Sequence, residues 1–180
     1  MDAYRYGVLL LMVSVVPAQV DAQRKNEIFV GRYDARVEYE DRSLAEERAK
    51  GFQVGYFRRF GEIFGVKASY FLLDNEVSSK FDVSGYDVSL LYGALGQGFN
   101  MFGGLGYFSE TREGGYWGGD GNFSGLQFVV GAGYKWERIG LDFTFKSRDP
   151  SDYERAVNAS SNIDTQASAY SGSLNIGYRF

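Results

Sequence analysis

The 180-residue chain contains no cysteine and no histidine. Without cysteine it has no disulfide, no thiolate nucleophile and no cysteine-based zinc site. Without histidine it lacks the commonest general base and the commonest metal ligand. An acidic-pair mechanism would need two carboxylates in separate roles, for which Glu38, Asp87 and Asp142 qualify by residue type alone. We therefore expect no enzyme, with no catalytic residues, no metal site and no cofactor.

The chain also lacks long runs of basic residues and lacks apolar runs long enough to cross a bilayer as a helix. Its formal net charge is −4 and no long basic run occurs, so we expect no nucleic-acid partner. An apolar run at residues 7–16 is too short to cross a bilayer as a helix, but it fits the core of a secretory signal peptide. We predict cleavage after Ala22, with Ala18 as the alternative site. Residues 1–22 would then be the signal peptide and residues 23–180 a single domain.

The chain is rich in glycine and aromatic residues, with 24 Gly, 14 Tyr and 15 Phe. Apolar and polar residues alternate along eight segments, and this period of two predicts strands because successive side chains point to opposite faces. In the first segment, Phe29, Tyr33 and Val37 share one face, and the other face carries charges. The segments are residues 28–40, 52–56, 64–72, 86–92, 99–107, 126–136, 139–146 and 170–180.

The links between these segments alternate in length. Those near residues 58–63, 94–97 and 137–138 are short, whereas those near 41–50, 74–81, 110–123 and 147–165 are longer and polar. Short periplasmic turns and longer external loops are typical of outer-membrane barrels. We predict an all-β fold, an eight-stranded antiparallel up-and-down transmembrane β-barrel. Residues 43–50 have helix propensity and are expected to form a loop with one helical turn.

A soluble, lipocalin-like barrel would have the same two faces, with the apolar face inside. Aromatic residues near the strand ends favour the membrane, because they are typical of interfacial girdles. So does the chain's last strand, which ends in Tyr178 and Phe180 and has the form of a C-terminal targeting signal. We expect the apolar face to meet lipid and the polar face, rich in Gly and Ser, to line the interior.

With these features the chain resembles the OmpA/OmpX/opacity-type superfamily of eight-stranded outer-membrane barrels. The resemblance covers residues 28–180 and rests on the strand count, the runs at 102–107 (FGGLGY) and 131–135 (GAGYK), and the terminal Phe180. It implies a monomer in the bacterial outer membrane. Its partners would be outer-membrane lipid, lipopolysaccharide and the barrel-assembly machinery. It implies function poorly, because members are anchors, adhesins, pores and lipid enzymes.

The polar face predicts a charge network in the lumen, since mixed charges in a narrow interior should pair. Eight strands leave little room, which favours a salt-bridge plug over a charge-lined solute path. The predicted lumen residues are Arg32, Asp34, Arg36, Glu38, Lys67, Asp87, Lys135, Asp142, Lys146 and Arg179.

The longer links are the candidates for external contacts. Tyr116 and Trp117, among glycines, form either a recognition tip or an anchor in the lipid headgroup zone. The polar segment 147–165 is suited to contact lipopolysaccharide or host surfaces.

We predict a non-enzymatic surface protein that supports envelope integrity or loop-mediated adhesion and binding. The alternative is a narrow porin-like channel for small solutes. A third possibility is a module that passes apolar ligands to a lateral opening near the weak fifth segment.

Overall fold

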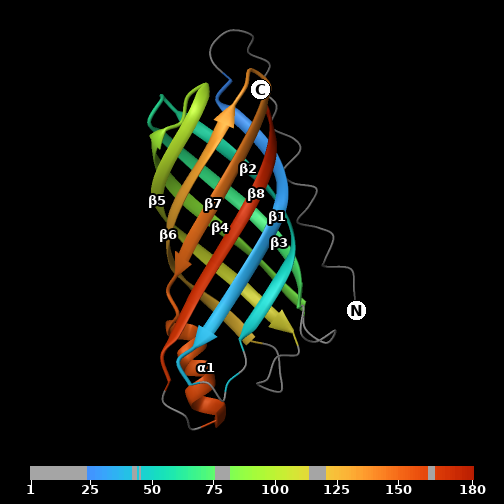
Figure 1. Cartoon of the computed structure of the whole chain (residues 1–180), viewed down its shortest axis with the longest axis vertical. Helices are drawn as coiled ribbons and strands as arrows, with labels where there is room; N and C mark the ends of the chain where they lie inside the picture. Colours follow the sequence, from blue (N-terminus) through green and yellow to red (C-terminus); the bar gives the residue numbers. More distant parts are fainter. Residues whose placement is uncertain (1–23, 42–43, 45, 76–81, 114–120, 162–164) are drawn as a thin grey trace.

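The computed structural model describes residues 24–41, 44, 46–75, 82–113, 121–161 and 165–180. The expected signal peptide and both cleavage sites lie outside these ranges. Eight strands form a closed barrel in which each strand pairs antiparallel with its sequence neighbours, and β8 closes onto β1 (Figure 1). The predicted fold class is confirmed. The strands are β1 (Asn26–Tyr39), β2 (Glu47–Phe60), β3 (Phe64–Asn75), β4 (Asp82–Ala94), β5 (Gly98–Glu113), β6 (Gly121–Lys135), β7 (Ile139–Arg148) and β8 (Ala167–Arg179).

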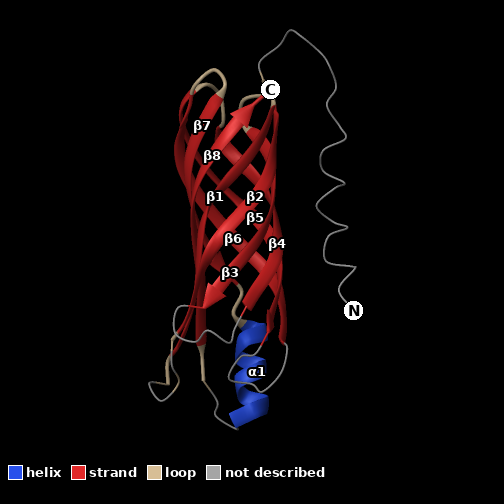
Figure 2. Cartoon of the chain, turned by 90° about the vertical axis from the view of Figure 1, so that its right-hand side faces the viewer, coloured by secondary structure: helices blue, strands red, loops and turns tan. Residues whose placement is uncertain are grey.

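The two ends of the barrel differ. The C-terminus and the start of β1 lie at one end, together with the short turns that join β2 to β3, β4 to β5 and β6 to β7; we call this the turn end. A helix, α1 (Ser151–Ser161), lies at the opposite end, which we call the helix end (Figure 2). Within the described ranges, no helix is long and apolar enough to span a membrane.

The helix begins where the local sequence supplies a cap. The Asp149 carboxylate accepts hydrogen bonds from the Ser151 backbone N–H at 3.1 Å and from its hydroxyl at 2.6 Å. Pro150 directly precedes the helix, and its carbonyl accepts the hydrogen bond from the Glu154 backbone N–H at 3.1 Å. The prediction of a helical turn at residues 43–50 was wrong in its second half, because β2 already begins at Glu47. There the period-two pattern, which buries Glu47 and Ala49, overrides helix propensity.

The helix is also bonded to the two strands that flank β7. β7 ends at Arg148, while β6 continues beyond it toward the helix end. Along that stretch α1 lies close enough to both neighbouring strands to bond to them through its side chains. Its Asp152 accepts a hydrogen bond from the Ser124 N–H on β6, and its Glu154 accepts one from the Ala167 N–H on β8, both at 2.8 Å.

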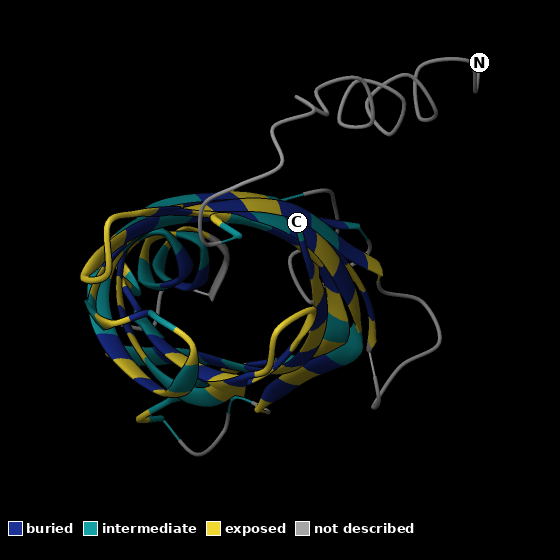
Figure 3. Ribbon diagram, turned by 90° about the horizontal axis from the view of Figure 1, so that it is seen from above, coloured by how far each residue is buried: buried dark blue, intermediate teal, exposed yellow. Residues whose placement is uncertain are grey.

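Large apolar side chains cover the outside of the barrel. On β2 to β8 the predicted apolar face points outward, as exposed Phe52 (77%) and Leu174 (55%) show. Buried and exposed residues alternate around the ring seen along its axis (Figure 3). This is the arrangement of a barrel that meets lipid. The prediction of which face meets lipid is correct for seven strands.

β1 has the opposite orientation from the one predicted. Its aromatic residues Phe29 and Tyr33 are fully buried inside, and its charged residues from Arg32 to Glu38 point outward, whereas Glu27 near its start points inward. The register explains the error: Arg32 lies opposite Phe52 of β2 and Leu174 of β8, both outward. A one-residue shift would reverse every side chain of the strand, so the neighbouring strands decide its orientation.

The interior is filled by side chains. One apolar cluster near the turn end contains Phe29, Phe57 and Phe102. Clusters around Tyr33 and Phe108 occupy the half toward the helix end, and Tyr153 of α1 belongs to the second of them. Val157 of α1 is also fully buried. Gly55 leaves room for one of these rings, because a Cβ there would overlap Phe29.

Candidate functional site

The lumen holds charged side chains in the half toward the turn end. The Lys135 ammonium contacts both carboxylate oxygens of Glu27, at 2.6 and 2.7 Å, and lies 3.5 Å from Asp142. The Lys67 ammonium binds Asp142 at 2.7 Å, and the Asn175 amide donates to the same oxygen at 3.0 Å. All five side chains are buried. Two lysines and two carboxylates from four strands therefore neutralise one another inside the barrel.

A second pair lies near the Tyr33 ring. The Lys146 ammonium contacts the Asp87 carboxylate at 2.5 Å and lies 5.1 Å from the centre of the Tyr33 ring. Both charged groups are almost fully buried. Because removing one partner would leave the other charge unpaired in a dry interior, the pair holds β4 and β7 together.

The largest cluster lies under α1 at the helix end. The Glu110 carboxylate accepts hydrogen bonds from Arg112 at 2.7 Å, from Arg148 at 2.7 Å and from the Tyr153 hydroxyl at 2.8 Å. Arg112 also donates to Glu47 on β2. The cluster joins the strands β2, β5 and β7 to the helix.

Aromatic rings surround the two arginines of this cluster. The Arg148 guanidinium lies 4.4 Å from the centre of the Phe108 ring, and the Arg112 guanidinium 4.9 Å from that of Tyr153. The Tyr153 ring stacks on Phe123 at 4.6 Å. Burial raises the pKa of Tyr153, and the Glu110 carboxylate raises it further, so the phenol stays protonated and keeps donating to Glu110.

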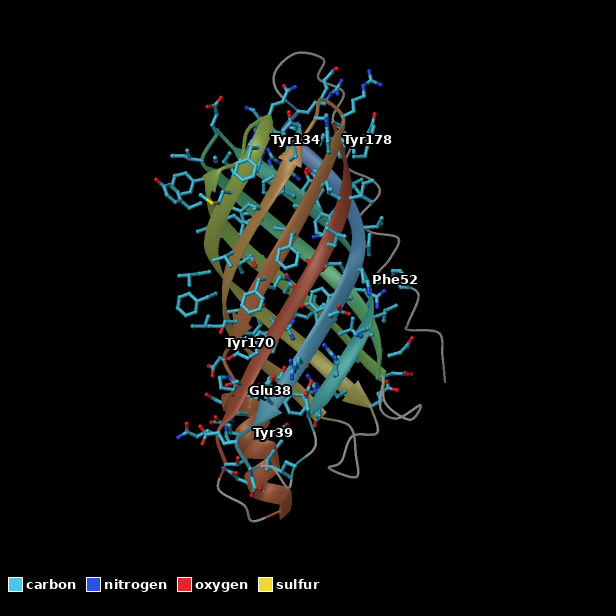
Figure 4. All side chains as sticks on the ribbon, in the orientation of Figure 1. Glu38, Tyr39, Phe52, Tyr134, Tyr170 and Tyr178 are labelled. Carbon is cyan, nitrogen blue, oxygen red and sulfur yellow. The ribbon has the colours of Figure 1, made fainter. Side chains whose placement is uncertain are left out.

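Six predicted lumen residues lie inside the barrel: Lys67, Asp87, Lys135, Asp142, Lys146 and Arg179. The other four predicted lumen residues, Arg32, Asp34, Arg36 and Glu38, lie on the outside of β1, which corrects the prediction. There Arg36 pairs with Glu38 at 2.7 Å and with Glu46 at 2.5 Å. Figure 4 labels Glu38 near the helix end of the barrel.

The remaining predicted residues are placed as follows. Tyr116 and Trp117 lie outside the described residues. The Tyr178 ring is exposed on the outer face of β8 and stacks on the ring of Phe180 at 6.5 Å.

Sequence reasoning missed several charged residues of the interior. Glu27 precedes the predicted first segment, and Glu110 and Arg112 were assigned to a link. In the structure β5 extends to Glu113, so both lie on its inward side. The sequence could have predicted this, because positions 100, 102, 108, 110 and 112 are all even and therefore lie on the same face of a strand. Among the described residues, no group of three or more acidic side chains is placed to hold a metal ion.

The comparisons with known proteins concern the fold. No protein-family model and no curated protein matches the chain. The structure of Ail, the attachment invasion locus protein of Yersinia pestis, matches with a TM-score of 0.54 and 18% identity. It covers 88% of this chain and 100% of that one. Neisserial surface protein A matches with a TM-score of 0.60, 11% identity, and coverage of 86% and 97%.

The outer membrane protein OprG of Pseudomonas aeruginosa matches with a TM-score of 0.52, 14% identity, and coverage of 88% and 97%. This chain has the fold of the eight-stranded outer-membrane barrels. Its expected location in the bacterial outer membrane agrees with that fold and with the apolar side chains that cover its outer face.

Proposed function

We propose that the barrel is a non-enzymatic surface protein of the outer membrane with a closed lumen, acting through its helix end in envelope integrity or in adhesion and binding. The observation that carries the proposal is the Glu110 cluster, in which α1 is bonded into the mouth of the barrel through Tyr153. A mouth filled in this way favours contacts on the outside over passage through the inside.

The paired charges argue against a permanent channel. A conducting lumen needs charged groups that water and ions can reach, whereas Glu110, Arg148 and Lys146 are almost fully buried. Each also contacts an opposite charge at 2.7 Å or less. Opening a path would break these pairs, and a buried charge left alone costs several kcal/mol, on the order of 3–5.

Conductance in a planar bilayer tests the closed lumen. Refolded wild-type barrel should be silent, and Arg148→Ala, which removes a bulky buried side chain beside Glu110, should give openings. Arg36→Ala is the control, because Arg36 lies on the outer face and should leave the bilayer silent. Gel mobility with and without heating establishes that each variant is folded. Discrete openings in the wild type would contradict the proposal and favour the porin-like channel.

The surface role has its own test. We propose Tyr116 and Trp117 as contact residues in the link between β5 and β6. Bacteria that produce a Tyr116→Ala, Trp117→Ala variant should lose adhesion to host surfaces or show a weaker envelope in detergent, with unchanged barrel levels. If both readouts stay at the wild-type level, these residues do not carry the function.

Lipopolysaccharide is the partner that the outer face of β1 supports best. Arg32 lies in a row with Phe143, Leu174, Phe52 and Leu72, all outward and apolar except Arg32 itself. A cation in such a row is unfavourable against hydrocarbon and favourable beside a lipid phosphate. We also propose that Tyr178 and Phe180 carry the signal read by the barrel-assembly machinery, and that the barrel is monomeric.

A further inference from the structure

The outward apolar surface of the barrel is uneven in height. On β6 the outward side is apolar from Leu126 to Trp136, and Phe128 and Val130 between them are 69% and 55% exposed. In a strand tilted by about 40°, a run of this length rises about 25 Å, which is the height of the apolar band of an outer-membrane barrel. The wall formed by β6 therefore spans the hydrocarbon completely.

β1 has a much shorter apolar run. Only Ile28 and Val30 are apolar among its outward residues, and they cover about 5 Å of height by the same geometry. Asn26 precedes them at the turn end, where its side-chain oxygen accepts a hydrogen bond from the Tyr56 hydroxyl at 2.7 Å. Arg32 follows them toward the helix end, with 66% of its side chain exposed. The outward side of β1 is thus polar at both ends of a short apolar segment.

β2 has the same pattern beside β1. Its outward apolar run extends from Phe52, which Figure 4 labels, to Tyr56, and covers about 10 Å of height. Lys50 bounds this run toward the helix end, and Arg58 bounds it toward the turn end. Arg58 is exposed, and its guanidinium lies 5.4 Å from the centre of the Phe60 ring.

Strand pairing joins the two short runs into one surface. Asn26 lies opposite Arg58 and Arg32 lies opposite Phe52, so the apolar runs of β1 and β2 are side by side. We call the outward surface of residues 26–32 and 50–58 the short wall. In the closed ring, β5 and β6 lie across the barrel from β1 and β2. A bilayer of uniform thickness cannot match the short wall and the β6 wall at the same time.

We propose that the membrane is thinned beside the short wall, where the phosphate-bearing headgroups of the surrounding lipids contact the barrel. An arginine is most unfavourable at the bilayer midplane and least so at the interfaces, so Arg32 and Arg58 favour headgroups close to them. A bilayer accommodates such cations by local thinning, while the long side chains extend toward the headgroups. Because each ångström of mismatch has only a modest cost, a few ångströms of thinning is the less costly arrangement.

Charge favours lipid over a second barrel as the occupant of the short wall. A guanidinium group binds phosphate through paired hydrogen bonds, and the short wall has one arginine toward each end of the barrel. The Asp34 carboxylate lies 3.8 Å from Arg32 Nε, beyond hydrogen-bond distance. Two copies related by a two-fold axis would bring these arginines against identical arginines, which is repulsive. The inference holds for any phospholipid bilayer, so it does not depend on the proposed contact with lipopolysaccharide.

Spin labels on the two walls measure the local depth of the membrane. The chain has no cysteine, so Val54→Cys on the short wall and Val130→Cys on β6 give one label each. Both positions lie near the middle of the outward apolar run of their strand. In phosphatidylcholine vesicles we compare the accessibility of each label to a water-soluble nickel chelate with its accessibility to oxygen. This ratio should be about twofold or more higher at Val54, because headgroups and water lie closer to a label in a thinned region.

Replacing the two arginines tests the cause of the thinning. In the variant Arg32→Leu, Arg58→Leu the short wall gains apolar height, so the ratio at Val54 should fall to the ratio at Val130. Arg48→Leu is the matched control, because Arg48 is exposed on the same strand but lies outside the apolar run, and it should leave the ratio unchanged. Gel mobility with and without heating establishes that each variant is folded. If the double variant does not fold, Arg58→Leu alone should lower the ratio part of the way.

Three results would overturn the proposal. Equal ratios at Val54 and Val130 in the folded wild type would mean that the membrane has the same thickness on both sides. An unchanged ratio in the folded double variant would mean that the arginines do not cause the thinning. A label at Val54 that neither reagent reaches would mean that a protein chain, such as a second copy, covers the short wall. Because the vesicles contain no lipopolysaccharide, none of these results depends on lipopolysaccharide as a partner.

Discussion

Glu110→Gln should destabilise the barrel more than any other single neutralisation of a carboxylate near the helix end. The carboxylate accepts bonds from Arg112, Arg148 and Tyr153, all near 2.7 Å, and its side chain is 0% exposed. Glutamine keeps the shape but loses the charge that both guanidinium groups face. Removing one partner of a buried ionic cluster costs about 3–5 kcal/mol, because the remaining charges stay buried.

Glu110→Gln should affect the helix through one hydrogen bond, the one that Tyr153 donates to Glu110. Tyr153→Phe deletes the hydroxyl that donates to Glu110 and should cost about 1.5–3 kcal/mol, the range for a hydrogen bond to a charged group. If the helix is held through that carboxylate, the double variant should be less destabilised than the two single changes together. We expect a coupling of about 0.5–3 kcal/mol, as for side chains in direct contact.

The assay is urea unfolding of the barrel refolded in lipid vesicles, followed by tryptophan fluorescence. Glu38→Gln is the control, because Glu38 forms an exposed pair with Arg36 that should contribute less than about 1 kcal/mol. If the free energy of unfolding of Glu110→Gln lies within about 1 kcal/mol of the wild-type value, the Glu110 cluster does not stabilise the barrel as described. Strict additivity with Tyr153→Phe would show that the helix is held by packing alone.

Three further predictions follow from the structure. Gly55→Ala should impair folding, because its methyl group would overlap the Phe29 ring, whereas Gly103→Ala should fold normally because the nearest atom to its Cβ lies at 3.7 Å. Raising the pH above 10 should destabilise the wild type more than it destabilises Tyr153→Phe. Because the pKa of Tyr153 is raised above its ordinary value of 10.0, the stability that the phenol contributes is fully present below pH 10 and is lost as the pH rises further. Arg32→Leu should stabilise the barrel by about 1 kcal/mol in phosphatidylcholine vesicles, and lipopolysaccharide should cancel that gain.

Each of these has a simple readout. Gel mobility reports folded yield for the two glycine variants, and equal yields would contradict the steric argument. Urea midpoints at pH 9 and pH 11 compare wild type with the tyrosine variant, and parallel shifts would mean that other groups control the alkaline response. An identical effect of Arg32→Leu in both kinds of vesicle would argue against a phosphate partner for the outer face of β1.

The strands were predictable from the sequence because alternation in a membrane barrel has one physical cause: one face meets hydrocarbon. On β6 and β7 that face is apolar along almost its whole length, as Phe128, Val130, Leu141 and Phe143 show. The same reasoning gave the wrong outward face for β1, because the outward side of this strand is apolar only at Ile28 and Val30, while its inward side carries the larger aromatic rings. The alternation of apolar and polar residues within one segment therefore predicts a strand, but it does not predict which face of that strand points outward.

The site was only partly predictable, for a related reason. Asp142 and Lys67 lie on strands whose apolar face is unambiguous, so their inward position follows from parity. Their partnership does not, because β3 and β7 are not neighbours in the sheet and meet only across the lumen. The position of α1 also could not be predicted from the local sequence, since Tyr153 is buried by contacts with β5 and β6 rather than by its own neighbours in sequence.

The short β7 has a consequence for how the barrel meets other chains. Where β6 and β8 continue past it, they would each present unpaired backbone N–H groups, and such an edge is a template for adding a foreign strand. The carboxylates of Asp152 and Glu154 accept hydrogen bonds from Ser124 and Ala167 at these edges. The helix thus protects the barrel against strand-by-strand aggregation at the point where its sheet is incomplete.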